Sequence, residues 1–171
     1  MRAALVGLGC ALLACAPTGV AAQSIKPHQD RAPDSPLEEL LQGAVHGRTP
    51  PRTFEAAFME QKVYLRITPE SYTALQAARG ADGRLTAQTP IQLWVVTSET
   101  PSPLAPMFTS EAAFRRTYPE HPWISVTGRQ ALELIKAPTA VRVGDGDGHM
   151  VTWTVAEIGL LQARYPDAST R

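Results

Sequence analysis

The sequence predicts an α+β fold, a single domain in which helices pack on one mixed β-sheet of about five to six strands. Apolar residues recur at helical spacing in several segments and alternate with polar residues in others. The two kinds of segment do not alternate strictly along the chain, which argues against an all-parallel sheet. About 130 residues carry these patterns, a length suited to one domain with its own core.

The first 22 residues predict export from the cytoplasm. Residues 3–14 form an apolar run too short to span a bilayer, and Val20–Ala22 supplies the small residues of a cleavage site before Gln23. An alternative is a lipoprotein signal, because Leu12–Cys15 resembles a bacterial lipobox in which Cys15 is lipidated. We therefore expect a periplasmic or secreted protein, or, in the alternative, a lipoprotein anchored to the membrane through Cys15.

Composition and charge exclude several classes of protein. The 16 basic and 16 acidic residues balance, and no basic stripe suited to nucleic acid is present. No later apolar run is long enough to cross a membrane. Both cysteines, Cys10 and Cys15, lie in the first 22 residues, so a chain cleaved after them has no disulfide and depends on its core.

Three segments follow the export signal in the predicted organisation. Residues 23–35 are expected to form a flexible linker, since they contain two prolines and only one large apolar residue. Residues 36–165 form the α+β domain, and residues 166–171 form a disordered tail.

Two helices open the predicted domain. Ser35, followed by a proline and then Glu38, matches a capping box, and apolar residues on one face continue toward Gly47. After a turn rich in proline, apolar residues recur at helical spacing from Phe54 to Met59 and predict a second, shorter helix.

The next stretch is predicted to form a strand, a helix, a loop and a strand. Alternation over residues 62–68 indicates a half-buried strand, and Thr68 followed by a proline starts a helix that ends near Gly80. The polar residues 80–89 are expected in a loop or hairpin tip. In residues 91–97 both alternating sets contain large apolar side chains, which predicts a strand in the interior of the sheet.

A further strand and helix come next. The strand Leu104–Phe108 contains Pro106, which cannot donate a backbone hydrogen bond and so predicts an edge, a bulge or a very short strand. Thr109 or Ser110 is expected to cap a short helix that ends near Tyr118.

The last third of the domain is predicted as a strand, a helix, a β-hairpin and a helix. Residues 123–126 form the strand, and Thr127 opens the helix with a second capping box. Residues 140–153 form a hairpin with a glycine-rich tip, and Thr154 caps the final helix. Gly159 inside this helix is interpreted as permitting a close approach to the sheet.

Several of these segments carry a family resemblance. They are the leucine-rich first helix, the strands KVYL and LWVV, the sequence Pro-Met-Phe-Thr-Ser-Glu at 106–111, Trp123–Gly128 with the helix after it, and the hairpin that leads into the closing helix. Together they resemble the N-terminal domain of the SseB family, which includes the enhanced serine sensitivity protein. The resemblance covers residues 36–162.

The resemblance implies an α+β domain of poorly defined function that is usually intracellular. This sequence differs from the family pattern because it carries an export signal and shows no C-terminal domain of the family. Its hairpin also has a Gly-Asp repeat at 143–148 where family members often have an Asn-Pro pair. These differences affect the expected cellular role more than the expected fold.

The sequence predicts no catalytic residue, metal or cofactor. The four histidines are scattered without zinc-ligand spacing, and Thr109-Ser110 lacks the Gly-x-Ser-x-Gly elbow of a serine hydrolase. We therefore expect a non-enzymatic protein, with a small hydrolase of unrecognised site as one alternative. A calcium-dependent binding module is the other alternative, because Asp145 and Asp147 lie two residues apart, although a simple turn also explains them.

One stretch is a candidate partner surface because it combines residue types that are enriched in binding hot spots. Its residues are Arg115, Arg116, Tyr118, His121 and Trp123. The ordinary alternative is that the aromatic rings pack on the core while the arginines are solvated. The function expected from the sequence is a protein-binding or scaffold module of the bacterial envelope, with another envelope or secreted protein as its partner.

Overall fold

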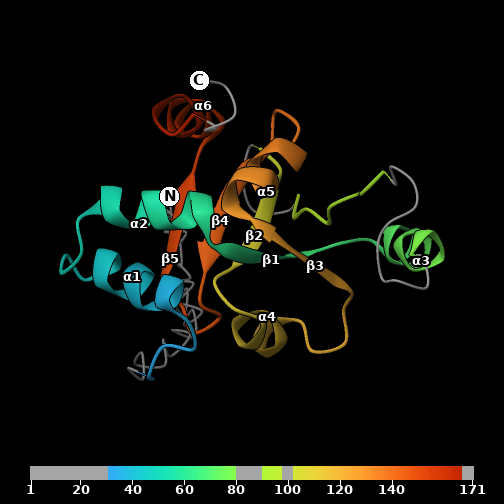
Figure 1. Ribbon diagram of the computed structural model, residues 1–171, viewed down its shortest axis with the longest axis horizontal. Helices are drawn as coiled ribbons and strands as arrows, with labels where there is room; N and C mark the ends of the chain where they lie inside the picture. The colour runs from blue at the N-terminus through green and yellow to red at the C-terminus, as the bar shows by residue number, and fades with distance from the viewer. Residues whose placement is uncertain (1–30, 80–89, 98–101, 167–171) are drawn as a thin grey trace, which may run out of the picture.

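The computed structural model describes residues 31–79, 90–97 and 102–166 (Figure 1). These residues form six helices and one five-stranded mixed sheet, which confirms the predicted α+β single domain. The helices are α1 (Pro36–Val45), α2 (Pro51–Glu60), α3 (Pro69–Ala78), α4 (Glu111–Thr117), α5 (Gly128–Leu134) and α6 (Val155–Arg164). The strands are β1 (Lys62–Arg66), β2 (Leu104–Phe108), β3 (Trp123–Thr127), β4 (Ala140–Gly144) and β5 (Met150–Trp153). The predicted export signal, residues 23–30, the loop 80–89 and residues 167–171 lie outside the described residues.

The five strands lie in the order β3-β1-β2-β4-β5. Neighbouring strands are antiparallel except β2 and β4, which are parallel. The connection between these two strands is a crossover that contains α4, β3 and α5. The central strand is therefore β2, and β3 and β5 are the two edges of the sheet.

Residues 91–97 do not form the predicted interior strand, so that prediction is wrong. Within the described residues the segment makes two isolated bridges, Leu93 with Ile67 and Val96 with Leu104. The ring of Trp94 lies 4.1 Å from the guanidinium carbon of Arg66 in β1. The backbone of the segment thus pairs with the end of β1 and the start of β2 without forming a regular ladder, and each of its residues is half-buried or exposed.

The predicted edge position of Pro106 is also wrong. Pro106 lies in the central strand, where it pairs with Arg142 of β4. The ladder between β1 and β2 contains only Met107 and Phe108 of β2. Because Pro106 lies beyond the end of that ladder, its missing N–H costs no hydrogen bond to β1.

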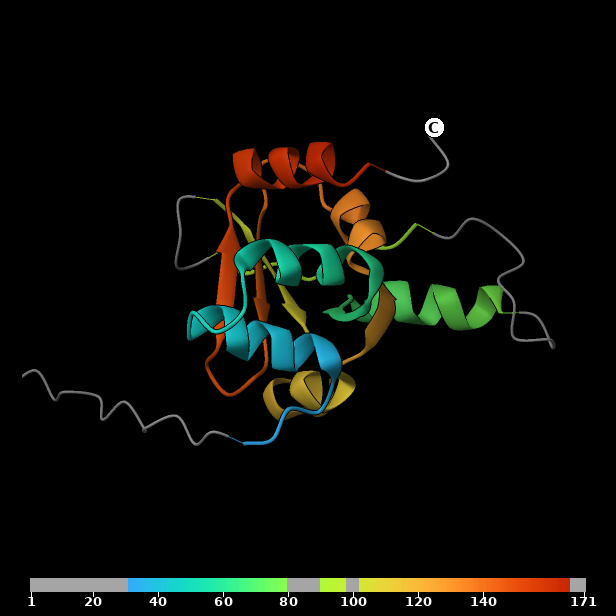
Figure 2. The same cartoon turned by 60° about the vertical axis from the view of Figure 1, so that its left-hand side comes forward.

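The main core lies between one face of the sheet and four helices. Strand residues such as Val63 and Val141 are fully buried against apolar side chains of α1, α2, α5 and α6. Figure 2 shows α1 and α2 crossing in front of the sheet. The rings of Phe54 and Phe58 in α2 lie 6.0 and 4.9 Å from the ring of Trp153 in β5. A second cluster, built on Phe108, Ala113 and Phe114, attaches α4 to the sheet.

Side-chain caps start most of the helices where the sequence predicts them. Ser35, Thr68, Ser110, Thr127 and Thr154 each accept a hydrogen bond from the backbone N–H three residues later. The helices that follow Thr127 and Thr154 have complete capping boxes. The box predicted at Ser35 is only half formed. The hydroxyl of Ser35 accepts from the N–H of Glu38, but the carboxylate of Glu38 binds Arg31 and Ser110 instead of the backbone N–H of Ser35.

Helix α3 stands beside the edge strand β3 rather than on the face of the sheet (Figures 1 and 2). Ser71 is the buried residue of this helix, and its hydroxyl accepts a hydrogen bond of 2.8 Å from the N–H of Gln92. Tyr72 on the same helix is 43% exposed. No helix in the described ranges is long and apolar enough to cross a membrane.

Two glycines differ in the space around them. A Cβ atom added at Gly128 would lie 2.1 Å from the carbonyl oxygen of Phe58, so this glycine permits the close contact between α5 and α2. A Cβ atom added at Gly159 would meet nothing within 4 Å. The interpretation of Gly159 as a site of close approach is therefore wrong, because this part of α6 faces open space.

We expect Gly128→Ala to lower the free energy of unfolding by about 2–3 kcal/mol, because the new methyl group overlaps a backbone oxygen. Gly159→Ala is the matched control and is expected to raise it by up to about 1 kcal/mol through helix propensity. Urea unfolding followed by circular dichroism measures both changes. Equal effects of the two substitutions would contradict the close contact at Gly128.

Candidate functional site

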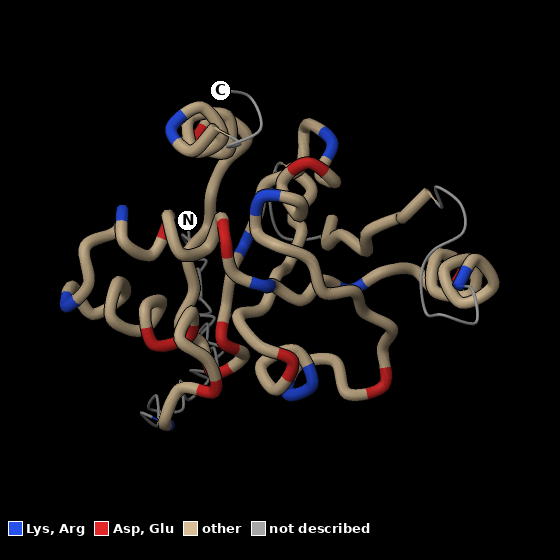
Figure 3. The backbone as a smooth tube through the Cα atoms, viewed as in Figure 1, with Lys and Arg blue, Asp and Glu red and all other residues tan. Residues whose placement is uncertain are grey.

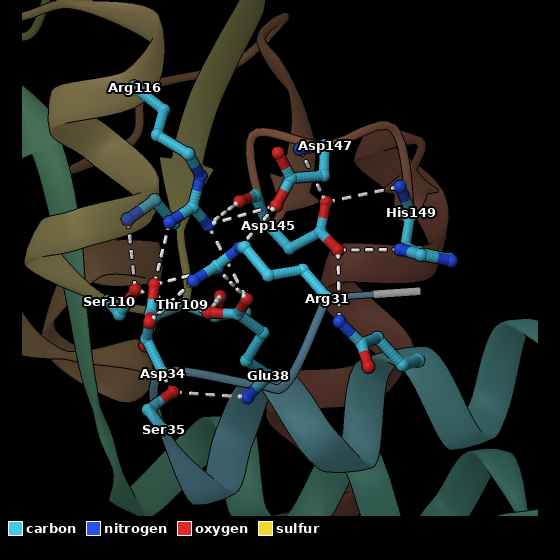
Figure 4. A network of polar contacts seen from close by, with 12 residues as sticks. Arg31, Asp34, Ser35, Glu38, Thr109, Ser110, Arg116, Asp145, Asp147 and His149 are labelled. Carbon is cyan, nitrogen blue, oxygen red and sulfur yellow. Dashed lines mark hydrogen bonds and ion pairs between the residues drawn. The ribbon is translucent and has the colours of Figure 1, made fainter. Parts of the chain in front are cut away.

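Charged side chains from four segments of the chain meet at one end of the molecule. Figure 3 shows acidic residues of α1 and of the preceding chain close to the β4–β5 turn and to the basic end of α4. We call the group the charged network, and Figure 4 shows its contacts. Its members are Arg31, Asp34, Glu38, Arg116, Asp145 and Asp147.

Glu38 lies at the centre of the charged network and is 0% exposed. Its Oε1 atom lies 2.9 Å from a guanidinium nitrogen of Arg31 and 3.4 Å from one of Arg116. Its Oε2 atom accepts a hydrogen bond of 3.2 Å from the hydroxyl of Ser110. A buried carboxylate without such partners is strongly destabilising, so these contacts are the condition for burying Glu38.

The two arginines hold carboxylates that would otherwise repel one another. Arg31 lies 2.7 Å from Asp34 and 3.2 Å from Asp147. Arg116 lies 2.6 Å from Asp34 and 3.3 Å from Asp147, and it also donates to the carbonyl oxygen of Asp145. The residues from Arg31 to the start of α1 are thus bound to the domain, although the sequence predicts a flexible linker there.

Asp145 organises the β4–β5 turn and orients a histidine. Its Oδ1 atom accepts from the N–H groups of Asp147 and His149, at 2.8 and 3.1 Å. Its Oδ2 atom lies 2.6 Å from Nδ1 of His149, which is 3% exposed. Because a carboxylate accepts here, Nδ1 carries the proton and Nε2 is directed toward His46 at the end of α1, 3.2 Å from Nε2 of that residue.

Burial and pairing move the pKa values of these carboxyl groups in opposite directions. Desolvation raises the pKa of Glu38 above its usual value. Hydrogen bonds from Arg31 and then Arg116 lower the pKa of Asp34 to about 2. Burial opposes the ionisation of Asp145, but hydrogen bonds from Asp147 N–H and from His149 outweigh it and leave the pKa of Asp145 below its usual value.

The geometry of the charged network does not favour the calcium alternative. One carboxylate oxygen from each of Glu38, Asp145 and Asp147 lies within 4.8 Å of the others. These carboxylates accept from guanidinium groups, from backbone N–H groups or from His149. A calcium ion needs six to eight oxygen ligands, so it would have to displace this set of partners.

Ser110 caps α4, and the hydroxyls of Thr109 and Ser110 contact the charged network through Glu38. The hydroxyl of Ser110 accepts from the N–H of Ala113 at 3.0 Å, which confirms the predicted cap. The hydroxyls of both residues point to Glu38, at 3.5 Å for Thr109 and 3.2 Å for Ser110. A carboxylate that also binds two guanidiniums is not the base of an activated nucleophile, so these contacts do not support the hydrolase alternative.

A groove of about 1020 Å³ runs between α3 and the edge strand β3. One wall comes from α3 and the other from β3 and the chain that leads into it. Most of its surface is apolar or aromatic, and the lining also includes three charged residues, Arg79, Arg115 and Glu120. Residues that define it include Tyr72, Arg79, Arg115, His121, Trp123 and Ser125.

The structure divides the predicted partner surface among three places. Arg115, His121 and Trp123 line the groove. Arg116 turns to the other side of α4 and belongs to the charged network. Tyr118 packs with Phe108 and Phe114 in the second cluster, with ring centroids 5.7 and 5.6 Å away. Trp123 also packs against this cluster, so both rings pack as the ordinary alternative expects.

Sequence reasoning missed one wall of the groove and the whole charged network. The wall formed by α3 was missed because it depends on where this helix lies relative to the sheet. The weak apolar pattern of the α3 sequence does not indicate that position. The turn around Asp145 did contain an indication, since a histidine four residues after an aspartate can return to it across a tight turn. Two partners of Glu38, Ser110 and Arg116, lie 72 and 78 residues away in the chain, so no local pattern indicates these contacts.

These observations define a class: a single α+β domain on a five-stranded mixed sheet, with one edge strand beside a groove and a charged network at one end. The family model described as SseB protein N-terminal domain matches residues 37–158. The chain belongs to the SseB family, which confirms the resemblance seen in the sequence. No curated protein and no solved structure matched the chain.

We expect Asp34→Asn to lower the free energy of unfolding at pH 7 by about 1 kcal/mol, because Arg31 and Arg116 lose a partner that is partly exposed to solvent. The pKa of Asp34 is lowered in the folded state, so its contribution is present above the usual aspartate pKa and is lost as the pH falls toward about 2. Chemical unfolding between pH 2 and pH 7 measures this loss.

Glu39→Gln is the control for this substitution, since Glu39 is an exposed α1 residue that forms no ion pair in the described part of the chain. Its stability is expected to stay close to that of the wild type across the same pH range. A difference between Asp34→Asn and the wild type that stays constant down to pH 2 would contradict the proposed role of Asp34.

Proposed function

We propose that this domain is a non-enzymatic binding module that holds an extended segment of another protein in the groove between α3 and β3. The partner segment would pair with the outer edge of β3 as an additional strand and place its side chains against α3. Main-chain hydrogen bonds supply affinity in this mode of recognition, and the lining of the groove supplies specificity.

The observation that carries the proposal is the open edge of β3 inside the groove. β3 pairs with β1 on one side, and among the described residues no other strand pairs with it. Residues 122–126 nevertheless line the groove, so this edge faces a cavity with an opposing wall. An edge strand of this kind is a template for another strand unless something covers it.

The lining of the groove fits a peptide with apolar and acidic side chains. Tyr72 presents an exposed ring on α3, and Trp123 contributes an aromatic surface at the start of β3. Arg79 and Arg115 outnumber the one acidic residue of the lining, Glu120. Aromatic and arginine side chains are common anchors of protein interfaces, and the excess of positive charge favours an acidic segment.

We also propose that the protein acts outside the cytoplasm, on an envelope or secreted partner. The apolar run and the small-residue cleavage site at the start of the sequence support this location. Membership of the SseB family is compatible with the proposal because it defines the domain without defining its place in the cell.

A photoreactive amino acid at position 72 is expected to crosslink a protein from the native envelope, because this position points into the groove. Leu160 on α6 is the matched control, since it is also an exposed apolar residue, 64% exposed, but does not line the groove. Extended peptides from the captured protein are then tested for binding by fluorescence anisotropy.

In that assay Tyr72→Ala is expected to weaken peptide binding by about tenfold or more, and Leu160→Ala is expected to leave it unchanged. Equal crosslinking at positions 72 and 160, or equal affinity of the two alanine variants, would refute the groove as the binding site. Measurable turnover of the captured partner would instead refute the non-enzymatic role.

Mass spectrometry of the protein purified from its native cells is expected to show a mature chain that begins at Gln23. A chain that begins with a lipidated Cys15 would establish the lipoprotein alternative. An intact N-terminus with all of the protein in the cytoplasm would refute export.

A further inference from the structure

We propose that His46 and His149 form a binding site for a divalent transition-metal ion of the kind that prefers imidazole, with Zn²⁺ as the reference ion. The two residues are 103 positions apart in the chain, and the fold brings their Nε2 atoms to 3.2 Å. The site lies where the C-terminal end of α1 meets the β4–β5 turn. Nothing in the spacing of the histidines along the sequence indicates this pair.

The separation of the two nitrogen atoms matches that of two ligands on one metal ion. Zinc binds histidine nitrogen at about 2.0–2.1 Å, so two nitrogens at adjacent tetrahedral positions lie about 3.3 Å apart. Two imidazoles bound in this way would have ring centroids about 5 Å apart. The observed centroids are 5.1 Å apart, with the ring planes at 70° to each other.

The surroundings of His149 prepare it as a ligand. A metal-binding histidine usually donates its second N–H to a carboxylate, which fixes the tautomer and raises the basicity of the ligand nitrogen. Asp145 makes this contact at 2.6 Å, and the carboxylate is itself held by two backbone N–H groups and by Gln42. His149 is 3% exposed, so its ring has little freedom to turn away.

His46 contributes an accessible ligand in a favourable electrostatic position. It is the C-cap residue of α1, where the helix dipole is negative and attracts cations. The adjacent charged network contains four carboxylates and two guanidiniums, an excess of negative charge. Without metal the two rings share one hydrogen bond. Metal binding requires His46 to carry its proton on Nδ1, and this change of tautomer leaves the charge of the ring unchanged.

Two histidines leave coordination positions for water or for a group from another molecule. Such an open site suits Zn²⁺ or Cu²⁺, for which imidazole is a good ligand, and does not suit Ca²⁺ or Mg²⁺, which require several oxygen ligands. This preference separates the histidine site from the calcium alternative at the neighbouring carboxylates.

The test is a calorimetric titration of the chelator-treated protein with Zn²⁺ alone, and with Ca²⁺ alone for comparison. We expect one Zn²⁺ per chain and no heat of binding from Ca²⁺. Nitrogen-15 NMR of the histidine rings is expected to shift the Nε2 signals of both His46 and His149 on addition of Zn²⁺, and to leave those of His121 in place.

His46→Asn is the informative variant, because His46 is exposed at a helix end and its replacement should leave the fold intact, as a thermal melt can check. It is expected to weaken Zn²⁺ binding at least about tenfold, as loss of a ligand should cost no less than loss of a supporting residue. His121→Asn and His28→Asn are the matched controls and should bind as the wild type does. Absence of binding at millimolar Zn²⁺, undiminished binding by His46→Asn, or loss of binding in either control would overturn the proposal.

Discussion

The burial of one carboxylate, that of Glu38, is the constraint on which much of this end of the structure depends. An ionised group that is fully removed from water must have charged or hydrogen-bonding partners close by. Its partners come from the chain before α1, from the start of α4 and from the end of α4. α1 can therefore reach its place on the sheet only when these segments are also in place, which couples local helix formation to the tertiary fold.

The side chains at the charged network and those of α3 are held in different ways. At the charged network the side chains are held by several partners each, and the β4–β5 turn is fixed by the carboxylate of Asp145. Beside the edge strand β3, α3 has one buried residue, Ser71, whose hydroxyl accepts a hydrogen bond from the N–H of Gln92. A segment with few buried contacts opens locally at lower cost than the core, so α3 is the wall of the groove that can adjust to a ligand.

Local patterns in the sequence predicted the helices well because a helix is recognised by its cap and by its apolar face. Ser110, Thr127 and Thr154 each start a helix as predicted. The prediction of an interior strand at 91–97 failed because an apolar composition does not fix how much of a ladder forms: the segment makes two isolated bridges, and its residues are half-buried or exposed. Pro106 failed for a related reason, since its cost depends on where the neighbouring ladder ends. The candidate site was predictable only where it is continuous in sequence, at Arg115, His121 and Trp123; the charged network joins residues that only the fold brings together.

The attachment of Arg31 to the domain limits how far the folded domain could lie from a lipid anchor on Cys15. Because Arg31 contacts Asp34, Glu38 and Asp147, the described part of the folded domain begins at Arg31 and not at the start of α1. If a lipid on Cys15 anchors the protein, the sixteen residues that follow, up to Arg31, can span at most about 55 Å. A partner that is itself fixed in the same membrane would then have to present its binding segment within that distance, plus the width of one small domain.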